Sequence, residues 1–177
     1  DQGRVTHVDL DLAVDFARRT LAGTATLELA APAAGPLDLD TRALAITAVA
    51  TQAGAAVPFE LAADDPVMGS RLRLQLPSGT TAVAITYETS PEASALQWLE
   101  PAQTDGGRHP YLFSQCQAIH ARSVLPCQDS PLARFTYHAK LTVPEALTAV
   151  MAAAPGEKGP GARPGTRAFS FAMPQSI

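Results

Sequence analysis

The chain has few cysteines and little charge. Its 177 residues include two cysteines, and Asp, Glu, Lys and Arg together make up 17% of it, beside 46% hydrophobic residues. Two cysteines are too few for a disulfide framework, and the low charged fraction argues against disorder. We expect one folded domain with large buried surfaces, in which Cys116 and Cys127 are reduced and buried.

Basic clusters and long apolar runs are also missing. The net charge is -4 and the pI is about 5.5, so the chain offers no electrostatic footprint for phosphate backbones or anionic lipid. No apolar run approaches the ~20 residues of a membrane span, and the chain does not open with a charged segment followed by an apolar one. Neither nucleic acid nor a membrane is an expected partner.

The dominant hydrophobic period is two, which is typical of strands. Apolar residues alternate with polar ones over residues 8–16 and 25–29, and this pattern predicts a hairpin. Residues 72–76 and 83–87 alternate on either side of Ser78 and Gly79 and predict a second hairpin. Residues 135–143 and 169–173 predict two further strands.

Helical segments have little room. Five helix breakers interrupt the alanine-rich pieces, namely Pro32, Pro36, Gly54, Pro58 and Pro66. One short helical turn is expected at 120–124. Residues 155–166 are so rich in Gly and Pro that we expect an exposed hairpin loop without ladder hydrogen bonds. The chain is therefore predicted to be all-β, either a sandwich or a large curved sheet with a smaller sheet packed against it.

The segment HPYLFSQCQAIHARSVLPCQDSP at 109–131 places polar residues in a run without a solvent-face period. It resembles the segment that receives the substrate amine at the end of the N-terminal domain of leukotriene hydrolase-type zinc aminopeptidases. The resemblance continues through SPEASALQWLEPAQTDGGRHPYLF and, more loosely, VDFARRTLAGTATLEL. It implies that residues 1–177 form a single saddle-like N-terminal β domain, with a large curved, mostly antiparallel or mixed sheet and a smaller packed sheet. The concave sheet would cover the catalytic domain, and its edge would close one side of the cleft.

The catalytic motifs of that family are not in the sequence. The family depends on Gly-x-Met-Glu-Asn and on a His-Glu-x-x-His helix, which binds zinc through two imidazoles one turn apart. None of the four histidines here is followed by Glu. The resemblance implies that zinc is bound by an absent catalytic domain and that the present chain is not catalytic by itself.

By resemblance, Gln117 contacts the substrate amine and Gln115 lines the same pocket. An ammonium group needs acceptor oxygens at fixed positions, which a carboxamide supplies. Many broader zinc aminopeptidases carry Glu at the position of Gln117. A neutral amide should anchor the amine less strongly than a carboxylate does. The hydrogen bond is worth ~0.5–1.5 kcal/mol for the amide and ~1.5–3 kcal/mol for the carboxylate. It also tolerates a substrate without an amine, such as a lipid epoxide, although the residues do not establish epoxide hydrolysis.

Without the resemblance, Gln115 and Gln117 are interpreted as structural amides on one face of a strand, with Cys116 facing the core. Arg122 and Asp129 are expected to pair with each other or with backbone groups and to support the loop that presents Gln117.

Three other groups receive structural interpretations. A metal site formed by Cys116, Cys127, His109 and His120 is disfavoured because no C-x-x-C pair anchors it. A nucleophilic role for His120 is disfavoured because no nucleophile with a third orienting group is visible. Tyr111 and Phe113 could line the pocket, but aromatic residues in strand patterns are more often core, so we expect a packing role for both and for Trp98.

Two functions remain. The first is a substrate-recognition and structural domain of a zinc aminopeptidase, whose partners are its own catalytic domain and the amino terminus of a peptide. The alternative is a stand-alone β-sandwich module that binds a peptide or protein. The strand-like run at 169–177, which has no polar tail, favours a domain cut from a longer chain. A cytoplasmic location is expected by analogy, and a removed signal sequence would also leave Asp1 first.

Overall fold

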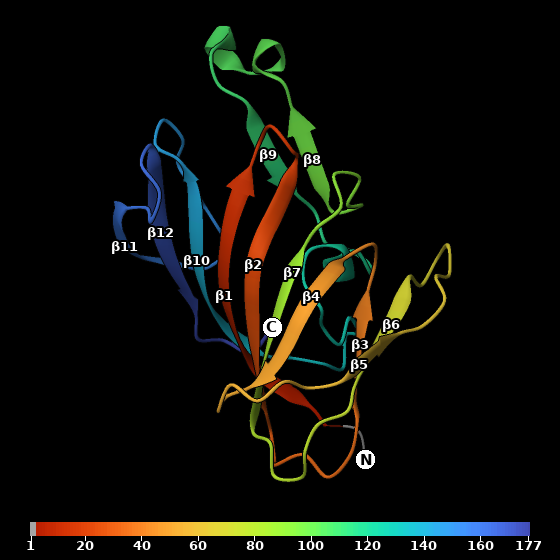
Figure 1. Cartoon of the computed structure of the whole chain (residues 1–177). Helices are drawn as coiled ribbons and strands as arrows, with labels where there is room; N and C mark the ends of the chain where they lie inside the picture. The colour runs from red at the N-terminus through yellow and green to blue at the C-terminus, as the bar shows by residue number, and fades with distance from the viewer. Residues whose placement is uncertain (1–2) are drawn as a thin grey trace.

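The computed structural model describes residues 3–177, and strands account for nearly all of their regular structure (Figure 1). The strands are β1 (Val5–Asp15), β2 (Thr20–Leu29), β3 (Leu37–Thr41), β4 (Ala45–Thr51), β5 (Phe59–Leu61), β6 (Ser70–Leu74), β7 (Ala82–Glu88), β8 (Leu96–Leu99), β9 (Tyr111–Ser114), β10 (Thr136–Pro144), β11 (Ala154–Pro160) and β12 (Thr166–Met173). Three short 3-10 helices join them, η1 (Pro101–Gln103), η2 (Asp105–Gly107) and η3 (Ala121–Ser123). The expected all-β class is confirmed, as is the helical turn near residue 120. Over residues 3–177 no helix is long and apolar enough to cross a membrane.

The large sheet is mixed and has seven strands in the order β11-β12-β10-β1-β2-β7-β4 (Figure 1). Strands β1 and β2 form the hairpin predicted from their alternation, with Leu10 opposite Ala25 and Asp15 opposite Thr20. Strand β1 also pairs in parallel with β10, which lies far along the chain. This pairing brings the two ends of the chain into one sheet.

The small sheet has the order β3-β6-β5 and packs against the inward face of the large sheet. Alternation directs Leu72 and Leu74 of β6 into the core, where both are fully buried. They join the core side chains of the large sheet, including Val83 and Ile85 of β7. Burying one such side chain contributes roughly 1.5–3 kcal/mol, so this shared core holds the two sheets together.

The predicted hairpin between 72–76 and 83–87 is wrong. Strand β6 pairs with β3 and β5, whereas β7 pairs with β2 and β4 in the other sheet. The turn at Ser78 and Gly79 does exist, but it carries the chain from one layer to the other. Alternation was interpreted correctly as strand, because both strands bury one face, and the error concerned only their partners.

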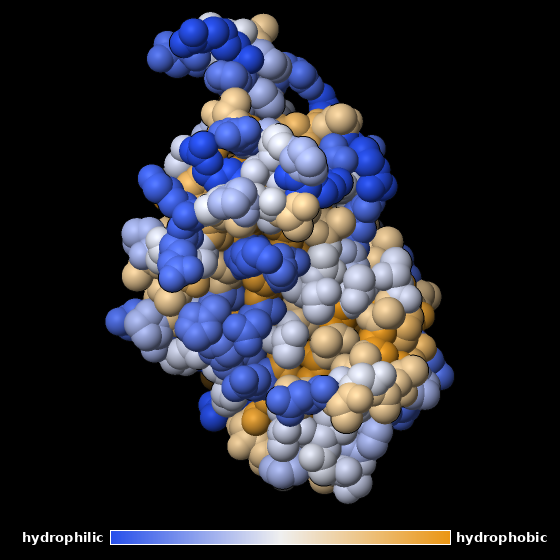
Figure 2. All heavy atoms as spheres, turned by 60° about the vertical axis from the view of Figure 1, so that its left-hand side comes forward, coloured by the Kyte–Doolittle hydropathy of each residue, from blue (hydrophilic) through white to orange (hydrophobic). Residues whose placement is uncertain are grey.

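Strands β8 and β9 form a separate two-stranded hairpin that extends beyond the large sheet (Figure 1). Strand β8 and the residue after it rest on the β1–β2 turn: Trp98 meets Phe16 edge to face at 5.3 Å between ring centroids, and Arg19 pairs with Glu100. Trp98 therefore has the packing role expected of it. The tip, formed by η1 and η2, stands out at the top of Figure 2 as a mostly hydrophilic projection.

Residues 155–166 lie in an exposed hairpin as expected, but its loop comprises only 161–165. Residues 154–160 form β11, which pairs antiparallel with β12 along one edge of the large sheet. An edge strand needs ladder hydrogen bonds on one side only, so Pro155 and Pro160 are tolerated there. The register shifts between Pro155 and Lys158, as expected of a bulge in such a sequence.

Candidate functional site

The segment 115–129 leaves the β8–β9 hairpin, returns under it through η3, and ends beside the small sheet. The ladder of the hairpin ends when the Gln115 amide donates to the Ala95 carbonyl at 2.9 Å. The side-chain oxygen of Gln115 then accepts from the Gln117 amide at 2.9 Å. The Gln115 side chain thus stabilises the turn that contains Gln117. The expectation that Gln115 and Gln117 alternate on a strand is wrong, because β9 ends at Ser114.

Gln117 itself points its carboxamide to the surface. The residue is exposed, and among residues 3–177 its side chain has no hydrogen-bond partner, so its acceptor oxygen is available to a ligand. The Gln115 carboxamide is therefore structural and the Gln117 carboxamide is free, a division that the sequence alone does not reveal. The peptide bond between Gln117 and Ala118 is cis.

The two thiols differ, against the expectation that both are buried. Cys127 lies in the core, where burial raises its pKa well above the ordinary value and the carboxylates of Asp129 and Asp40 raise it further. Cys116 is exposed as a residue rather than facing the core. Its thiol pKa is also raised, mainly by desolvation of the sulfur and then by Asp129. Neither thiol has the lowered pKa of a reactive cysteine.

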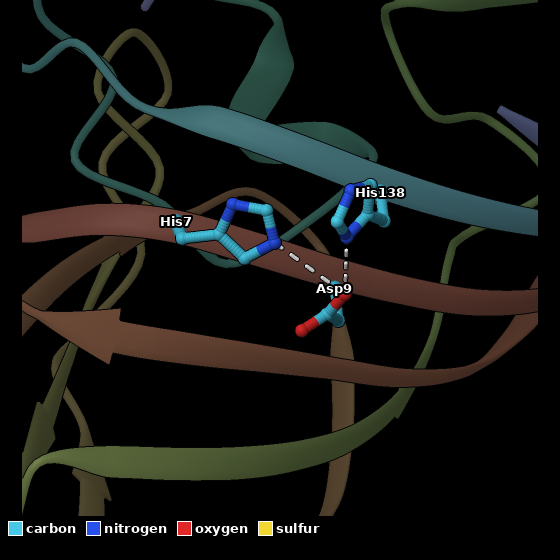
Figure 3. Close-up of side chains that lie close together, drawn as sticks. All are labelled: His7, Asp9 and His138. Atoms are coloured by element: carbon cyan, nitrogen blue, oxygen red, sulfur yellow. Dashed lines mark ion pairs between the residues drawn. The ribbon is translucent and has the colours of Figure 1, made fainter. Parts of the chain in front are cut away.

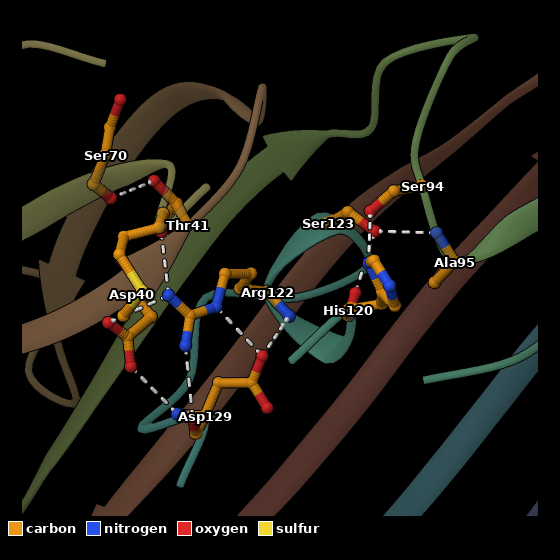
Figure 4. A network of polar contacts seen from close by, with 10 residues as sticks. Asp40, Thr41, Ser70, Ser94, Ala95, His120, Arg122, Ser123 and Asp129 are labelled. Carbon is orange, nitrogen blue, oxygen red and sulfur yellow. Dashed lines mark hydrogen bonds and ion pairs between the residues drawn. The ribbon is translucent and has the colours of Figure 1, made fainter. Parts of the chain in front are cut away.

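Arg122 lies at the centre of the polar network behind the turn (Figure 4). Its side chain is 2% exposed, and its Nε donates to the Asp129 carboxylate at 2.9 Å. Its Nη1 donates to the Met68 carbonyl at 2.7 Å and its Nη2 donates to the Asp129 carbonyl at 3.1 Å. The expected pair of Arg122 and Asp129 is therefore present, and it also reaches the turn before β6.

Asp40 of β3 completes this network. Its carboxylate lies 3.5 Å from Arg122 Nη1 and accepts from the Asp129 amide at 2.9 Å. The backbones of Asp40 and Cys127 exchange hydrogen bonds of 2.7 and 3.2 Å, and the Arg42 amide donates to the Arg122 carbonyl. A buried guanidinium loses its hydration, and the hydrogen bonds and ion pairs of this network compensate for that loss. The loop is consequently fixed to the small sheet from behind.

A second set of contacts ties η3 to the start of β8. Ser94 Oγ and His120 Nδ1 are 2.8 Å apart, and Ser123 Oγ accepts from the Ala95 amide and donates to the His120 carbonyl (Figure 4). Sequence inspection missed Ser94, which lies 26 residues from His120. A serine hydrolase places the serine and the orienting carboxylate on opposite imidazole nitrogens. Within residues 3–177 no carboxylate pairs with His120, so this contact is structural.

The aromatic residues of β9 were expected in the core, but they are exposed. Tyr111 is 55% exposed and Phe113 is 43% exposed, and their spacing places them on one face of the hairpin. They precede the Gln117 turn directly in the chain. The hairpin and the turn that follows it therefore present two aromatic rings and a free carboxamide at the surface.

Histidines and carboxylates gather elsewhere. In the described part of the chain, one group of three metal-ligating side chains comes together. It consists of His7 and Asp9 on β1 and His138 on β10 (Figure 3). The cysteines and the remaining histidines form no such cluster among the described residues. No pattern in the sequence marks this site, because it depends on the parallel pairing of β1 with β10.

The family of the chain follows from this fold and from comparison with known proteins. A model of the peptidase M1 N-terminal domain matches residues 5–176, so the chain belongs to this family, as the resemblance in segment 109–131 indicated. Leukotriene A-4 hydrolase of Xenopus laevis is 42% identical to it over 156 residues, which make up 84% of this chain and 26% of that protein. Leucine aminopeptidase 2 of Sclerotinia sclerotiorum is 35% identical over 179 residues, covering 95% of this chain and 29% of that one.

Solved structures agree with this assignment. Native leukotriene A4 hydrolase of Saccharomyces cerevisiae superposes with a TM-score of 0.85 at 31% identity, over 99% of this chain and 27% of that one. An M1 zinc metallopeptidase of Deinococcus radiodurans superposes with a TM-score of 0.75 over 99% of this chain and 40% of that one, and at 20% identity it shows the fold alone. The chain spans about a quarter of the length of the curated relatives named above.

Proposed function

We propose that this chain, taken as a single domain over residues 1–177, recognises the free amino terminus of a peptide for a zinc aminopeptidase. The carrying observation is the exposed, unpartnered carboxamide of Gln117, whose backbone amide donates to the Gln115 side chain. The buried network of Arg122 and Asp129 supports the turn from behind. A turn whose backbone is held in this way suits recognition of an ammonium group, because the attachment point of the acceptor side chain is set before the ligand arrives.

The zinc would come from a catalytic domain. The M1 relatives include zinc metallopeptidases, but this chain does not fit the family's catalytic zinc site, since no His is followed by Glu. The metal-ligating cluster of His7, Asp9 and His138 lies on strands rather than on one helix. On this proposal the present chain contributes binding of the substrate and the catalytic domain contributes hydrolysis.

The surface around Gln117 suits docking to that domain. Tyr111 and Phe113 expose apolar rings on the same hairpin, and aromatic residues are enriched at interfaces because they bury large areas at little entropic cost. With a catalytic domain against this hairpin, Gln117 would lie at the boundary between domains, where small-molecule sites are common. A cytoplasmic location remains a prediction.

The test measures hydrolysis of an alanyl chromogenic amide by the longer protein in which this chain is joined to a zinc-binding catalytic domain. We expect Gln117→Ala to lower kcat/KM by roughly fivefold, as for loss of one hydrogen bond worth about 1 kcal/mol, mainly through KM. We expect Gln117→Glu to lower KM, because a carboxylate adds charge to the bond with the ammonium.

Gln52→Ala is the matched control, since Gln52 is exposed in the turn after β4 and lies outside the β8–β9 hairpin. It should leave both constants unchanged. Equal activity of wild type and Gln117→Ala would exclude the proposed role of the carboxamide. Zinc-dependent hydrolysis by the 177-residue chain alone would exclude the division of labour between the two domains.

A further inference from the structure

Strands β1 and β10 bring two imidazoles and a carboxylate together on the outward face of the large sheet (Figure 3). His7 and Asp9 are two residues apart on β1, so they share a face. The parallel register places His138 opposite Asp9. None of the residues around Gln117 takes part, so this site belongs to a different region of the chain.

The separations among the donor atoms match the geometry of a metal site. Asp9 Oδ1 lies 3.5 Å from His7 Nε2 and 3.4 Å from His138 Nδ1. These distances exceed the usual range of a hydrogen bond. Two ligands of a tetrahedral zinc ion with bonds near 2.1 Å lie about 3.4 Å apart. Two edges of a coordination tetrahedron are therefore already formed by side chains alone.

A second contact fixes the first imidazole. Thr136 Oγ1 lies 2.6 Å from His7 Nδ1, and when it accepts the Nδ1 proton, Nε2 keeps its lone pair toward Asp9. Metal-ligating histidines characteristically hold their other ring nitrogen by such a bond. His7 is also the most enclosed of the three, with 17% of its side chain exposed. The ligand that is hardest to turn is thus already oriented.

The third ligand can complete the site. The donor atoms of the three side chains lie within 4.8 Å of one another. The His138 ring meets the His7 ring edge to face at 4.8 Å between centroids, and its side chain is 65% exposed, so a rotation of His138 can adjust these separations to one ion. Asp9 and His138 also line a hollow of about 500 Å³ on this face, where water can occupy the remaining coordination positions. Nearby Lys140 is paired with Asp11 at 3.0 Å.

We propose that His7, Asp9 and His138 form a binding site for a divalent transition metal, best suited to Zn²⁺. Two imidazoles and one carboxylate are donors that zinc accepts readily, whereas Mg²⁺ and Ca²⁺ require oxygen ligands. The ion joins β1 to β10 directly, and these two strands lie far apart in the chain. Zn²⁺ therefore stabilises the folded chain, by an amount that grows with the logarithm of one plus the ratio of the free Zn²⁺ concentration to Kd.

The test titrates the metal-free 177-residue chain with Zn²⁺ by calorimetry and repeats it with Mg²⁺. We expect one Zn²⁺ per chain and no binding of Mg²⁺. His138→Gln and Asp9→Asn should each weaken zinc binding by more than about tenfold, since each removes a ligand. Thr136→Val, which removes the contact to His7 Nδ1, should weaken it by about tenfold to a hundredfold.

The controls use residues of the same types outside the cluster. His109→Gln and Asp105→Asn change an exposed imidazole and an exposed carboxylate near the β8–β9 tip, and both should bind zinc like the wild type. Circular dichroism of each variant checks folding, and the imidazole NMR signals of His7 and His138 should shift on adding zinc while that of His109 does not. Binding that is equally weak in all proteins, or that is lost in His109→Gln and kept in His138→Gln, would overturn the proposal.

Discussion

Arginine–carboxylate pairs behave differently in two regions of this molecule. Behind the Gln117 turn, Arg122 is 2% exposed and Asp129 is 11% exposed. At the end of the β1–β2 hairpin, Arg18 makes an even shorter pair with Glu88, at 2.6 Å against 2.9 Å for Arg122 and Asp129, but the two side chains are 61% and 27% exposed. Solvent screens the second pair, whereas the first is surrounded by protein.

This difference shows that the two pairs have different roles although their chemistry is the same. The exposed pair contributes little, because water solvates each partner almost as well as the other partner does. Arg122 has no water to return to, so its network with Asp129, Asp40 and the Met68 carbonyl must remain complete. A loop that depends on such a network is fixed in one conformation, as a recognition loop requires.

The largest expected effect comes from removing the buried guanidinium. Arg122→Met should lower the free energy of unfolding by about 3–5 kcal/mol, because the mostly buried carboxylate of Asp129 loses its cation in a poorly solvated place. Arg18→Met is the matched control and should change it by less than the error of a urea titration. Equal losses in the two variants would mean that burial does not distinguish these pairs.

The turn that supplies the Met68 carbonyl gives a second, smaller test. Gly69 has φ of +73°, and a Cβ there would lie 2.2 Å from the Thr41 carbonyl oxygen. Gly54 has φ of +80° with no atom within 4 Å of such a Cβ. Gly54→Ala should cost about 1–2 kcal/mol for the left-handed backbone alone. Gly69→Ala should cost more in the same urea titration, because Thr41 must also move, and a smaller loss than for Gly54→Ala would contradict this account of the turn.

The smallest expected effect concerns Asp38 and Arg73, a pair of intermediate exposure between β3 and β6. The pKa of Asp38 is lowered, chiefly because the Arg73 side chain donates to its carboxylate. A carboxylate with a lowered folded pKa stabilises the fold above its unfolded pKa, and this stabilisation is lost as pH falls through the folded pKa. Asp38→Asn should therefore have a lower free energy of unfolding than wild type at pH 7, and the difference should be smaller at pH 3. A difference that does not change with pH would show that this pair does not contribute to the acid sensitivity.

The sequence predicted strands more reliably than their partners. Alternation over 8–16 and 25–29 identified the β1–β2 hairpin, because a short turn leaves these strands no other geometry. Alternation over 72–76 and 83–87 identified two strands but not that they lie in different sheets. A period of two reports which face is buried and is silent about the neighbouring strand.

The candidate site was also predicted only in part. The segment 109–131 indicated the family, and the Arg122–Asp129 contact was expected from their flanking positions. The division between Gln115 and Gln117 was not, because it depends on where β9 ends. The cluster of His7, Asp9 and His138 was missed entirely, since it requires a register between strands about 130 residues apart.

The two edges of the large sheet have a consequence for the chain in solution. At one edge, β11 carries Pro155 and Pro160, which cannot donate to a further strand. At the other edge, residues 55–57 fold back on β4 through hydrogen bonds such as the one from the Val57 amide to the Val49 carbonyl. In the described part of the chain neither edge of the large sheet offers a long open row of donors and acceptors, so this sheet is protected from edge-to-edge pairing by its prolines and by the fold-back at β4.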